Sequence, residues 1–420
     1  KVSSKPSVSL VTSSLRCFAS DIAMSLVVRC GLKHAPNGVD LSDQEKPLIQ
    51  DEKKKKKSDD IPCAVKVLGG CCCCVFLLVG LIFVSLKQYL AQEDGPYKVR
   101  CKTVPVPGLT AFVPLVRTAR ICYPKAEGTF PLHLFAHGDW GGGAFFWLGY
   151  SGLQEQLASY GFVVPAYLSC WFDTECSNGQ ASFLEALKTL TFLERHPNIA
   201  PVDWTKPYSA SGHSTGARAV LMLAALRDNP AFLDSTTLAS EVTPDMRTAL
   251  VNLKAVIADH PDPMYDEKQN PDIPNFRITE TPVFVITGSG DYWIEPQGSA
   301  WRDFQMVSSP DKVFINVHGA GHLEPNLYHS EGPFVAFFAR AFALGDVAAR
   351  AKIYGEGAGS LQRTLALAQP GDYNSGADEV AFLACSRDKT AVPHVFASYC
   401  DQRKVDERVG STSEEVIILE

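Results

Sequence analysis

Between residues 98 and 344, short apolar runs alternate with segments whose apolar residues recur at helical spacing. This alternation is typical of an α/β protein, in which helices cover both faces of a mostly parallel sheet. The predicted strands are residues 98–106, 118–123, 131–136, 162–165, 208–211, 251–258, 282–287 and 312–317. The predicted helices are residues 150–160, 182–195, 215–227 and 333–344. We therefore expect an α/β fold whose last strand is residues 312–317.

Two stretches interrupt this pattern. Residues 228–252 separate a predicted helix from the next strand, and residues 262–280 are polar and rich in proline. Both are expected at the C-terminal edge of the sheet, where ligands bind in folds of this kind.

Residues 67–86 form a run of twenty residues without a charged side chain. A helix of that length is about 30 Å long and just crosses the hydrocarbon core of a bilayer. The alternative is a buried core helix, but such a helix should show a polar stripe, and this run has none. Lysines 53–57 precede the run, so the positive-inside rule predicts a signal anchor with residues 1–66 as an unstructured cytosolic tail. A linker over residues 87–98 would then lead to an extracellular or luminal domain over residues 99–420.

Charge is spread unevenly along the chain. The whole sequence has 39 basic and 46 acidic residues, a formal net charge of −7. Residues 1–66 hold 12 basic and 8 acidic residues, so the remainder holds 27 and 38 and carries −11. A strongly acidic main body argues against nucleic acid as a partner, because phosphate binding needs clustered cations. The sequence has no zinc-type cysteine and histidine spacing, phosphate loop or dinucleotide fingerprint, so we expect neither a metal nor a cofactor.

Six cysteines follow the predicted membrane segment, and their even number fits an oxidising compartment. Sequence alone leaves their pairing open, although the short separations favour neighbours along the chain. The favoured pairs are Cys101 with Cys122, Cys170 with Cys176, and Cys385 with Cys400.

The motif Gly212-His213-Ser214-Thr215-Gly216 follows one predicted strand and opens the next predicted helix. A G-x-S-x-G motif in this position is typical of a nucleophile elbow, a sharp turn that exposes a serine hydroxyl at the edge of a sheet. The alternative is a glycine-rich turn that carries an ordinary serine. We expect Ser214 to be a catalytic nucleophile and His213 to pack beneath the sheet.

A serine hydroxyl is a weak nucleophile and needs a base. In chains with this elbow, an acid and then a histidine follow the serine. Asp291 ends the turn Gly288-Ser289-Gly290-Asp291 after the strand predicted at 282–287, and His322 follows the next strand, so both should lie at the same edge as Ser214. We predict His322 as general base and then acid, with Asp291 orienting its ring. Asp259, which also ends a strand, is the alternative acid.

Acyl transfer also requires two donors for the oxyanion that develops on the substrate. The backbone N–H of Thr215 should supply one, and that of Asp139, in the loop after the third strand, the other. Glycines 141–143 would let this loop approach a substrate closely. Further candidates for the substrate pocket are Trp140, Phe145, His260 and Trp293.

Several stretches resemble the α/β-hydrolase superfamily, in particular PET hydrolases, cutinase-like polyester hydrolases and dienelactone hydrolase-like enzymes. The resemblance covers residues 97–400 and is carried by FPLHLFAHG, LASYGFVV, VDWTKPYSASGHSTG, TPVFVITGSGDYWIEP and INVHGAGHLEPN. It implies the α/β-hydrolase fold and cleavage of carboxylic esters through an acyl-enzyme at Ser214. The stretch FLACSRDKTAVPHVFASYC is similar to the C-terminal disulfide loop of that branch, which implies a bond between Cys385 and Cys400.

The chain also departs from that branch. Its polyester hydrolases carry a tryptophan after the strand that ends here at Asp259, where this sequence has His260. Chlorophyllases and platelet-activating-factor acetylhydrolases resemble the chain more distantly and use a similar elbow and triad.

These observations lead to one main hypothesis and several alternatives. The main hypothesis is a membrane-anchored serine esterase that acts on a lipid-like or small apolar ester. Cleavage of chlorophyll esters is an alternative if the serine-rich N-terminal tract directs the chain to a plastid, and a platelet-activating-factor-acetylhydrolase-like esterase is another. A non-catalytic alternative is an inactive hydrolase fold that serves as a binding module, against which the presence of Ser214, Asp291 and His322 argues.

Overall fold

The computed structural model divides the chain into two units, residues 1–91 and residues 92–420, and all described residues belong to the second. The predicted membrane segment, residues 67–86, therefore lies outside the described residues. Within the described residues, no helix is both long enough and apolar enough to span a bilayer. The described residues are 95–109, 117–139, 141–169, 180–234, 237–264, 276–291, 297–324, 331–354 and 382–386.

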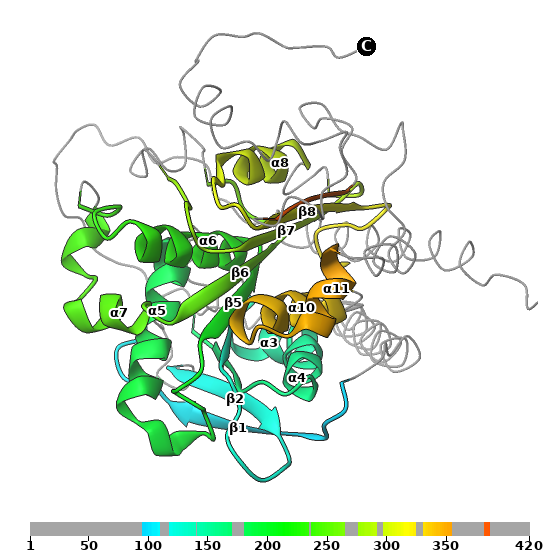
Figure 1. Cartoon of the computed structure of the whole chain (residues 1–420). Coiled ribbons are helices and arrows are strands. Elements are labelled where there is room, and N and C mark those ends of the chain that lie inside the picture. Colours follow the sequence, from blue (N-terminus) through cyan, green and yellow to red (C-terminus); the bar gives the residue numbers. More distant parts are fainter. Residues whose placement is uncertain are drawn as a thin grey trace, which may run out of the picture. The chain divides into compact units, whose positions relative to one another are not determined.

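One mixed sheet forms the centre of the described part of the chain (Figure 1). Its strands are β1 Val99–Pro105, β2 Thr118–Pro124, β3 His133–Ala136, β4 Val164–Tyr167, β5 Tyr208–His213, β6 Leu253–Asp259, β7 Val283–Gly288, β8 Lys312–Val317 and β9 Phe382–Cys385. They lie in the order β1-β2-β4-β3-β5-β6-β7-β8-β9. The six central strands, β4, β3, β5, β6, β7 and β8, are mutually parallel. Strands β1 and β2 at one end and β9 at the other pair antiparallel. The predicted α/β fold with a mostly parallel sheet is confirmed.

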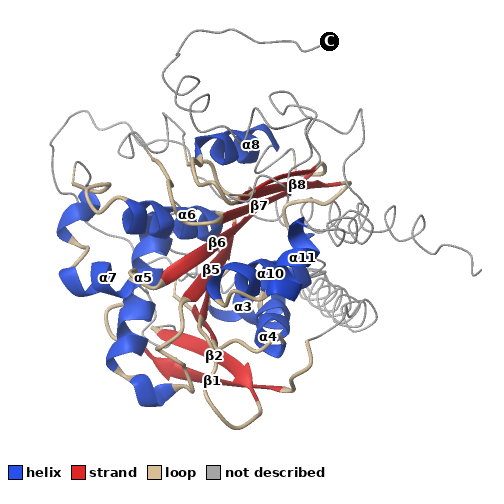
Figure 2. Ribbon diagram, viewed as in Figure 1, coloured by secondary structure: helices blue, strands red, loops and turns tan. Residues whose placement is uncertain are grey.

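Helices cover both faces of the sheet (Figure 2). The α-helices in the described residues are α3 Gly143–Gly149, α4 Ser151–Ser159, α5 Gln180–Arg195, α6 Thr215–Asp228, α7 Pro244–Ala249, α8 Gln297–Met306, α10 Gly332–Ala343 and α11 Val347–Tyr354. Helices α5, α6 and α8 pack on one face, and α4 and α10 pack on the other.

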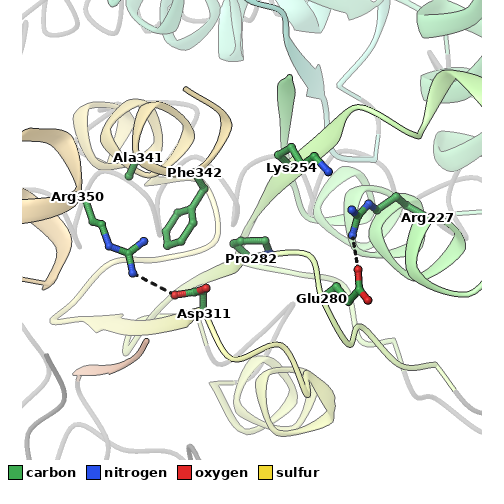
Figure 3. A pocket seen from close by; sticks show the side chains of 8 residues that line it. All are labelled: Arg227, Lys254, Glu280, Pro282, Asp311, Ala341, Phe342 and Arg350. Atoms are coloured by element: carbon green, nitrogen blue, oxygen red, sulfur yellow. Dashed lines mark hydrogen bonds and ion pairs between the residues drawn. The ribbon is translucent and has the colours of Figure 1, made fainter. Parts of the chain in front are cut away.

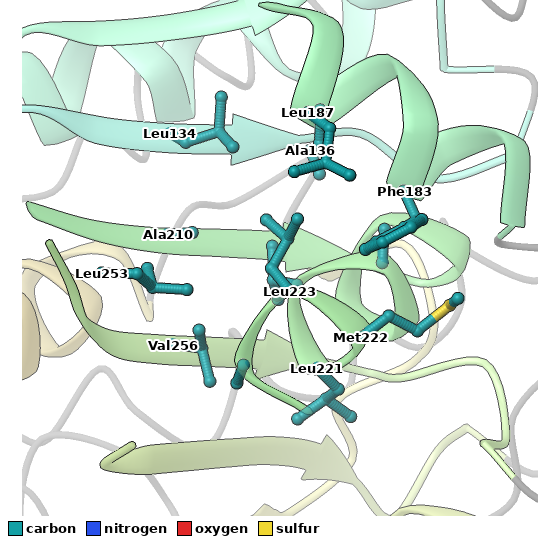
Figure 4. Close-up of a cluster of buried hydrophobic side chains, with 14 of the residues drawn as sticks. Leu134, Ala136, Phe183, Leu187, Ala210, Leu221, Met222, Leu223, Leu253 and Val256 are labelled. Carbon is teal, nitrogen blue, oxygen red and sulfur yellow. The ribbon is translucent and has the colours of Figure 1, made fainter. Parts of the chain in front are cut away.

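The central strands are buried along almost their whole length because helices cover both of their faces. In β6, Val256 and Ala258 belong to the core on the α6 side, while Ala255 and Ile257 belong to the core on the α10 side. Figure 4 shows the first core, where side chains of α5 and α6 lie over β3, β5 and β6. Helix α6 is buried from Thr215 to Leu226, so its sequence lacks the polar stripe of a surface helix.

Each predicted strand matches an observed strand, but the prediction that residues 312–317 form the last strand was wrong. Strand β9 follows much later in the chain and pairs antiparallel with β8, with Lys312 opposite Cys385. Helices α3, α7, α8 and α11 were also not predicted. Three of these four have eight residues or fewer, which is too short for helical periodicity to be distinctive.

The expected position of residues 228–252 was also wrong. The N–H of Tyr208, at the start of β5, donates to the carbonyl of Asn252, and the Tyr208 hydroxyl donates to the carbonyl of Ala249 at 2.7 Å. This segment therefore lies at the N-terminal edge of the sheet. The reason is that α6 starts at the C-terminal edge after β5 and runs back along the sheet, so its end reaches the opposite edge.

One predicted disulfide is confirmed. Cys101 and Cys122 face each other across β1 and β2, and a disulfide joins them with a Cα–Cα distance of 4.0 Å. Cys385 in β9 is also disulfide-bonded. The remaining cysteines of the predicted pairs, Cys170, Cys176 and Cys400, lie outside the described residues.

Candidate active site

Ser214 lies in a sharp turn between β5 and α6, at the C-terminal edge of the sheet. Its backbone has φ 55° and ψ −122°, a conformation that residues other than glycine rarely adopt. A Cβ atom at Gly212 would lie 2.2 Å from the carbonyl oxygen of Gly216, and one at Gly216 would lie 2.3 Å from that of Ala136. The two glycines of the motif are therefore required for the close approach of strand, turn and helix.

The turn is held by hydrogen bonds to the last residue of β6 and to the segment that follows it. The Ser214 N–H donates to the carbonyl of Asp259 at 3.0 Å, and the Ser214 carbonyl accepts from the N–H of Asp262 at 3.2 Å. The strained conformation is thus fixed by main-chain bonds on both sides of the serine. Its side chain is mostly buried in the described structure.

Asp291 and His322 come together from the ends of two neighbouring parallel strands, β7 and β8. The distance from His322 Nδ1 to Asp291 Oδ2 is 2.8 Å. Backbone bonds join the two loops, because Gly290 N–H donates to the carbonyl of Ala320 and Gly319 N–H donates to the Ser289 hydroxyl. The structure therefore places the predicted base next to the predicted orienting acid.

The alternative acid, Asp259, is paired with a different histidine. Its Oδ1 lies 2.8 Å from Nδ1 of His260, which is fully buried and has a φ of 46°. Burial disfavours the charged forms and so raises the pKa of Asp259. Burial alone would also lower the pKa of His260, but its hydrogen bond to Asp259 and the nearby carboxylates more than offset this, so the pKa of His260 is raised. Asp259 is therefore not the partner of His322.

The imidazole rings of His213, His260 and His322 lie together at the candidate site. Ring centroids are 4.7 Å apart for His213 and His322, 6.2 Å for His213 and His260, and 6.1 Å for His260 and His322. Burial, together with the charges of its two neighbours, lowers the pKa of His213 well below 6.5, so this ring is neutral. His213 is buried, and its ring packs against Tyr150 of the core on the α10 side of the sheet and against the two other imidazoles. Within the described residues, no group of acidic, histidine or cysteine side chains is arranged to hold a metal ion.

No hydrogen bond joins the Ser214 hydroxyl to the ring of His322 among the described residues. Among the described residues, Nδ1 of His322 bonds Asp291, and the carbonyl oxygen of His322 accepts from Nε2 of His213. Contact between serine and base is commonly loose in a free enzyme and tightens with substrate. The arrangement can therefore support proton transfer from Ser214 once a ligand is bound.

The two predicted oxyanion donors, Thr215 and Asp139, both follow strands that end at the same edge of the sheet, β5 and β3. Thr215 is the first residue of α6, so its N–H has no partner within the helix. Asp139 is exposed in the turn after β3, next to Gly138, whose own N–H donates to the Tyr150 hydroxyl at 3.0 Å. The N–H of Gly138 is therefore already engaged, and Asp139 stays a prediction as the donor from this loop.

The predicted pocket residues are only partly described. Phe145 on α3 is 41% exposed, and Trp147 and Leu148 on the same helix are 49% and 64% exposed. His260 is fully buried and does not line an open surface. Trp140 and Trp293 lie outside the described residues.

A cavity of about 710 Å³ lies at the opposite edge of the sheet (Figure 3). Lys254 at the start of β6, and Pro282 and Asp311 just before β7 and β8, line it. Its arginines are paired with acids, since Arg227 contacts Glu280 at 3.6 Å and Arg350 contacts Asp311 at 3.2 Å. This cavity is therefore separate from Ser214 and offers none of the candidate catalytic groups.

Two features of the site were not predicted from the sequence. One is the Asp259–His260 pair, for which the adjacent Asp and His at a strand end are the only local signal. The other is Tyr150, whose hydroxyl bonds His213, and no motif indicated it. No protein-family model matches the chain, and no curated protein matches it.

Proposed function

We propose that this chain is a serine hydrolase that cleaves carboxylic esters through an acyl-enzyme on Ser214. The observation that carries the proposal is the 2.8 Å bond between His322 and Asp291, at the sheet edge where Ser214 occupies a strained turn. Serine, acid and histidine follow in the order of α/β-hydrolases, and a strand–turn–helix surrounds the serine. These features support an α/β-hydrolase fold.

In the proposed reaction, Ser214 Oγ attacks the ester carbonyl carbon while Nε2 of His322 takes the hydroxyl proton. The N–H groups of Thr215 and Asp139 stabilise the resulting oxyanion. The alcohol then leaves with the proton from His322, and water repeats the sequence on the acyl group to release the acid. Asp291 bonds Nδ1, which keeps Nε2 of the neutral ring as the proton acceptor.

The proposed substrate is a lipid-like or small apolar ester. The exposed apolar side chains of α3, which follow the loop that carries Asp139, support this choice. They would be consistent with an anchor at residues 67–86 that holds the domain beside a membrane, with the domain outside the cell or in a lumen. Two alternatives use the same chemistry, a chlorophyllase-like and a platelet-activating-factor-acetylhydrolase-like esterase. Location in a plastid would favour the first, and location outside the cell would favour the second.

The test uses the 420-residue chain, a fluorophosphonate probe and p-nitrophenyl esters of increasing acyl length. We expect the probe to label Ser214, and turnover to peak at one acyl length. Ser214→Ala should lower kcat by roughly three or more orders of magnitude while leaving the melting temperature nearly unchanged.

Ser211→Ala is the matched control. Ser211 lies in β5 three residues before Ser214, and its hydroxyl is 2.7 Å from Nε2 of His133. Burial lowers the pKa of His133 to about 3, so the imidazole of this second serine–histidine pair is a weak base. The control should keep its labelling. A folded protein without labelling or turnover would instead support the inactive binding module.

A further inference from the structure

A chain of three hydrogen bonds crosses the candidate active site behind Ser214. The Gly138 N–H lies 3.0 Å from the Tyr150 hydroxyl, which lies 2.7 Å from Nδ1 of His213. Nε2 of His213 then lies 2.6 Å from the carbonyl oxygen of His322. The chain thus begins in the loop that precedes Asp139 and ends on the backbone of the candidate base.

Donor and acceptor rules fix the direction of this chain. A carbonyl oxygen only accepts, so Nε2 of His213 must carry a proton and donate to His322. In a neutral ring Nδ1 then accepts, so the Tyr150 hydroxyl donates to it while accepting from the Gly138 N–H. Burial keeps His213 neutral, as the preceding section describes. One tautomer of His213 therefore satisfies all three bonds at once.

Close packing leaves little room for another arrangement. Tyr150 and His213 are both buried, with ring centroids 5.8 Å apart. A Cβ atom at Gly138 would lie 2.8 Å from the Tyr150 hydroxyl oxygen and 3.0 Å from both His213 Nδ1 and Ser214 Cβ. Only glycine at this position lets the loop, the tyrosine and the elbow meet.

We propose that Tyr150 and His213 are positioning residues. They hold the loop that carries Gly138 and Asp139 at a fixed separation from the loop that carries His322. The two loops follow β3 and β8, which are separated in the sheet by β5, β6 and β7, so no strand pairing joins them directly. The hydrogen-bond chain supplies that link. This inference rests on the proposed function for its effect on catalysis, but the link itself can be tested without turnover.

The first test compares Tyr150→Phe with Tyr208→Phe. Each change removes one buried hydroxyl that donates a 2.7 Å hydrogen bond, but Tyr208 lies at the far edge of the sheet. We expect Tyr150→Phe to lower kcat roughly 10- to 100-fold with little change in KM, because a small displacement of catalytic groups has effects of that size. Tyr208→Phe should keep its kcat. Unchanged kcat in Tyr150→Phe, or an equal loss in both variants, would overturn the proposal.

The second test uses substitutions of His213. Glutamine retains an N–H donor near the position of Nε2, whereas leucine removes both polar atoms. We expect His213→Gln to keep much more of the wild-type kcat than His213→Leu at equal KM. Equal losses in the two variants would show that only the volume of the ring matters and would contradict the link.

A third measurement separates this inference from the proposed function. Selective ¹⁵N-histidine NMR of the wild-type chain should show His213 as the neutral Nε2–H tautomer, with its signal identified by its absence in His213→Gln. Tyr150→Phe should shift the Nδ1 resonance. These readouts hold whether or not the chain hydrolyses esters. A charged His213 ring or the Nδ1–H tautomer would refute the link even in an active enzyme.

Discussion

Two aspartate–histidine pairs lie at the C-terminal edge of the sheet, each with an Nδ1–Oδ distance of 2.8 Å. In the outer pair, Asp291 and His322 come from loops after two strands, and the His322 side chain is 9% exposed. In the inner pair, Asp259 and His260 are consecutive residues, and the His260 side chain is fully buried. Residue type and bond length are therefore equal in the two pairs. Access to the surface separates a pair suited to proton transfer from one suited to structure.

The inner pair has its own features of a structural element. His260 has a φ of 46°, and its Nε2 has no hydrogen-bond partner in the described structure. The carbonyl of Asp259 accepts from the N–H of Ser214. The pair thus fixes the segment that supports the elbow while its ring stays away from solvent.

The largest expected effect is on turnover when the outer pair is broken. Asp291→Asn should lower kcat on the order of 10³- to 10⁴-fold, because the amide can no longer favour the tautomer of His322 that accepts a proton at Nε2. Steady-state hydrolysis of a p-nitrophenyl ester measures this change. Asp259→Asn is the matched control and should lower kcat far less. A greater loss of kcat in Asp259→Asn than in Asp291→Asn would mean that the inner pair, and not the outer pair, serves catalysis.

The next effect is on stability when the inner pair is broken. Asp259→Asn should lower the free energy of unfolding by roughly 3 kcal/mol, because it leaves a buried histidine without its counter-charge. Denaturant unfolding with one slope for all variants measures the difference. Asp291→Asn should cost less, since the His322 ring can reach water. Equal losses would mean that burial does not distinguish the pairs.

The smallest effect is on the pH dependence of stability. The pKa of His260 is raised above 6.5, so the folded chain holds this proton more tightly than the unfolded chain does. The resulting stabilisation is fully present below pH 6.5 and is lost as pH rises through the folded-state pKa. The free-energy difference between wild type and His260→Gln should therefore decrease above pH 6.5 in unfolding measurements. A flat or rising difference would contradict a charged inner pair.

Much of the fold could be predicted from the sequence because its strands are buried on both faces. Strand β7 is buried throughout, and its sequence VFVITG is an apolar run that ends in Thr and Gly, while β6 carries the apolar run AVIA before Asp259. Strand β9 could not be predicted, because it is a four-residue edge strand far along the chain from its partner. Short strands of this kind carry little pattern of their own.

The residues of the candidate site could likewise be predicted only in part. Parallel strands bring their carboxyl ends to one edge, so Ser214, Asp259, Asp291 and His322 could be placed there from the sequence. The choice between Asp259 and Asp291 as the partner of His322 depends on the directions of side chains beyond the strand ends. The sequence does not encode these directions in a local pattern, so it left both aspartates as candidates. The contact of Tyr150 with His213 joins residues 63 positions apart, and no local pattern encodes it.

Strand β9 also has a consequence for how the chain can be shortened. It pairs with β8, whose six residues are all buried, along the side opposite β7. A truncation after α11 would uncover a row of unpaired N–H and C=O groups on an apolar strand. Open edges of this kind recruit other strands and lead to self-association. Strand β9 therefore protects the edge of β8 from pairing with other chains, and shortened forms of the protein should retain residues 382–385.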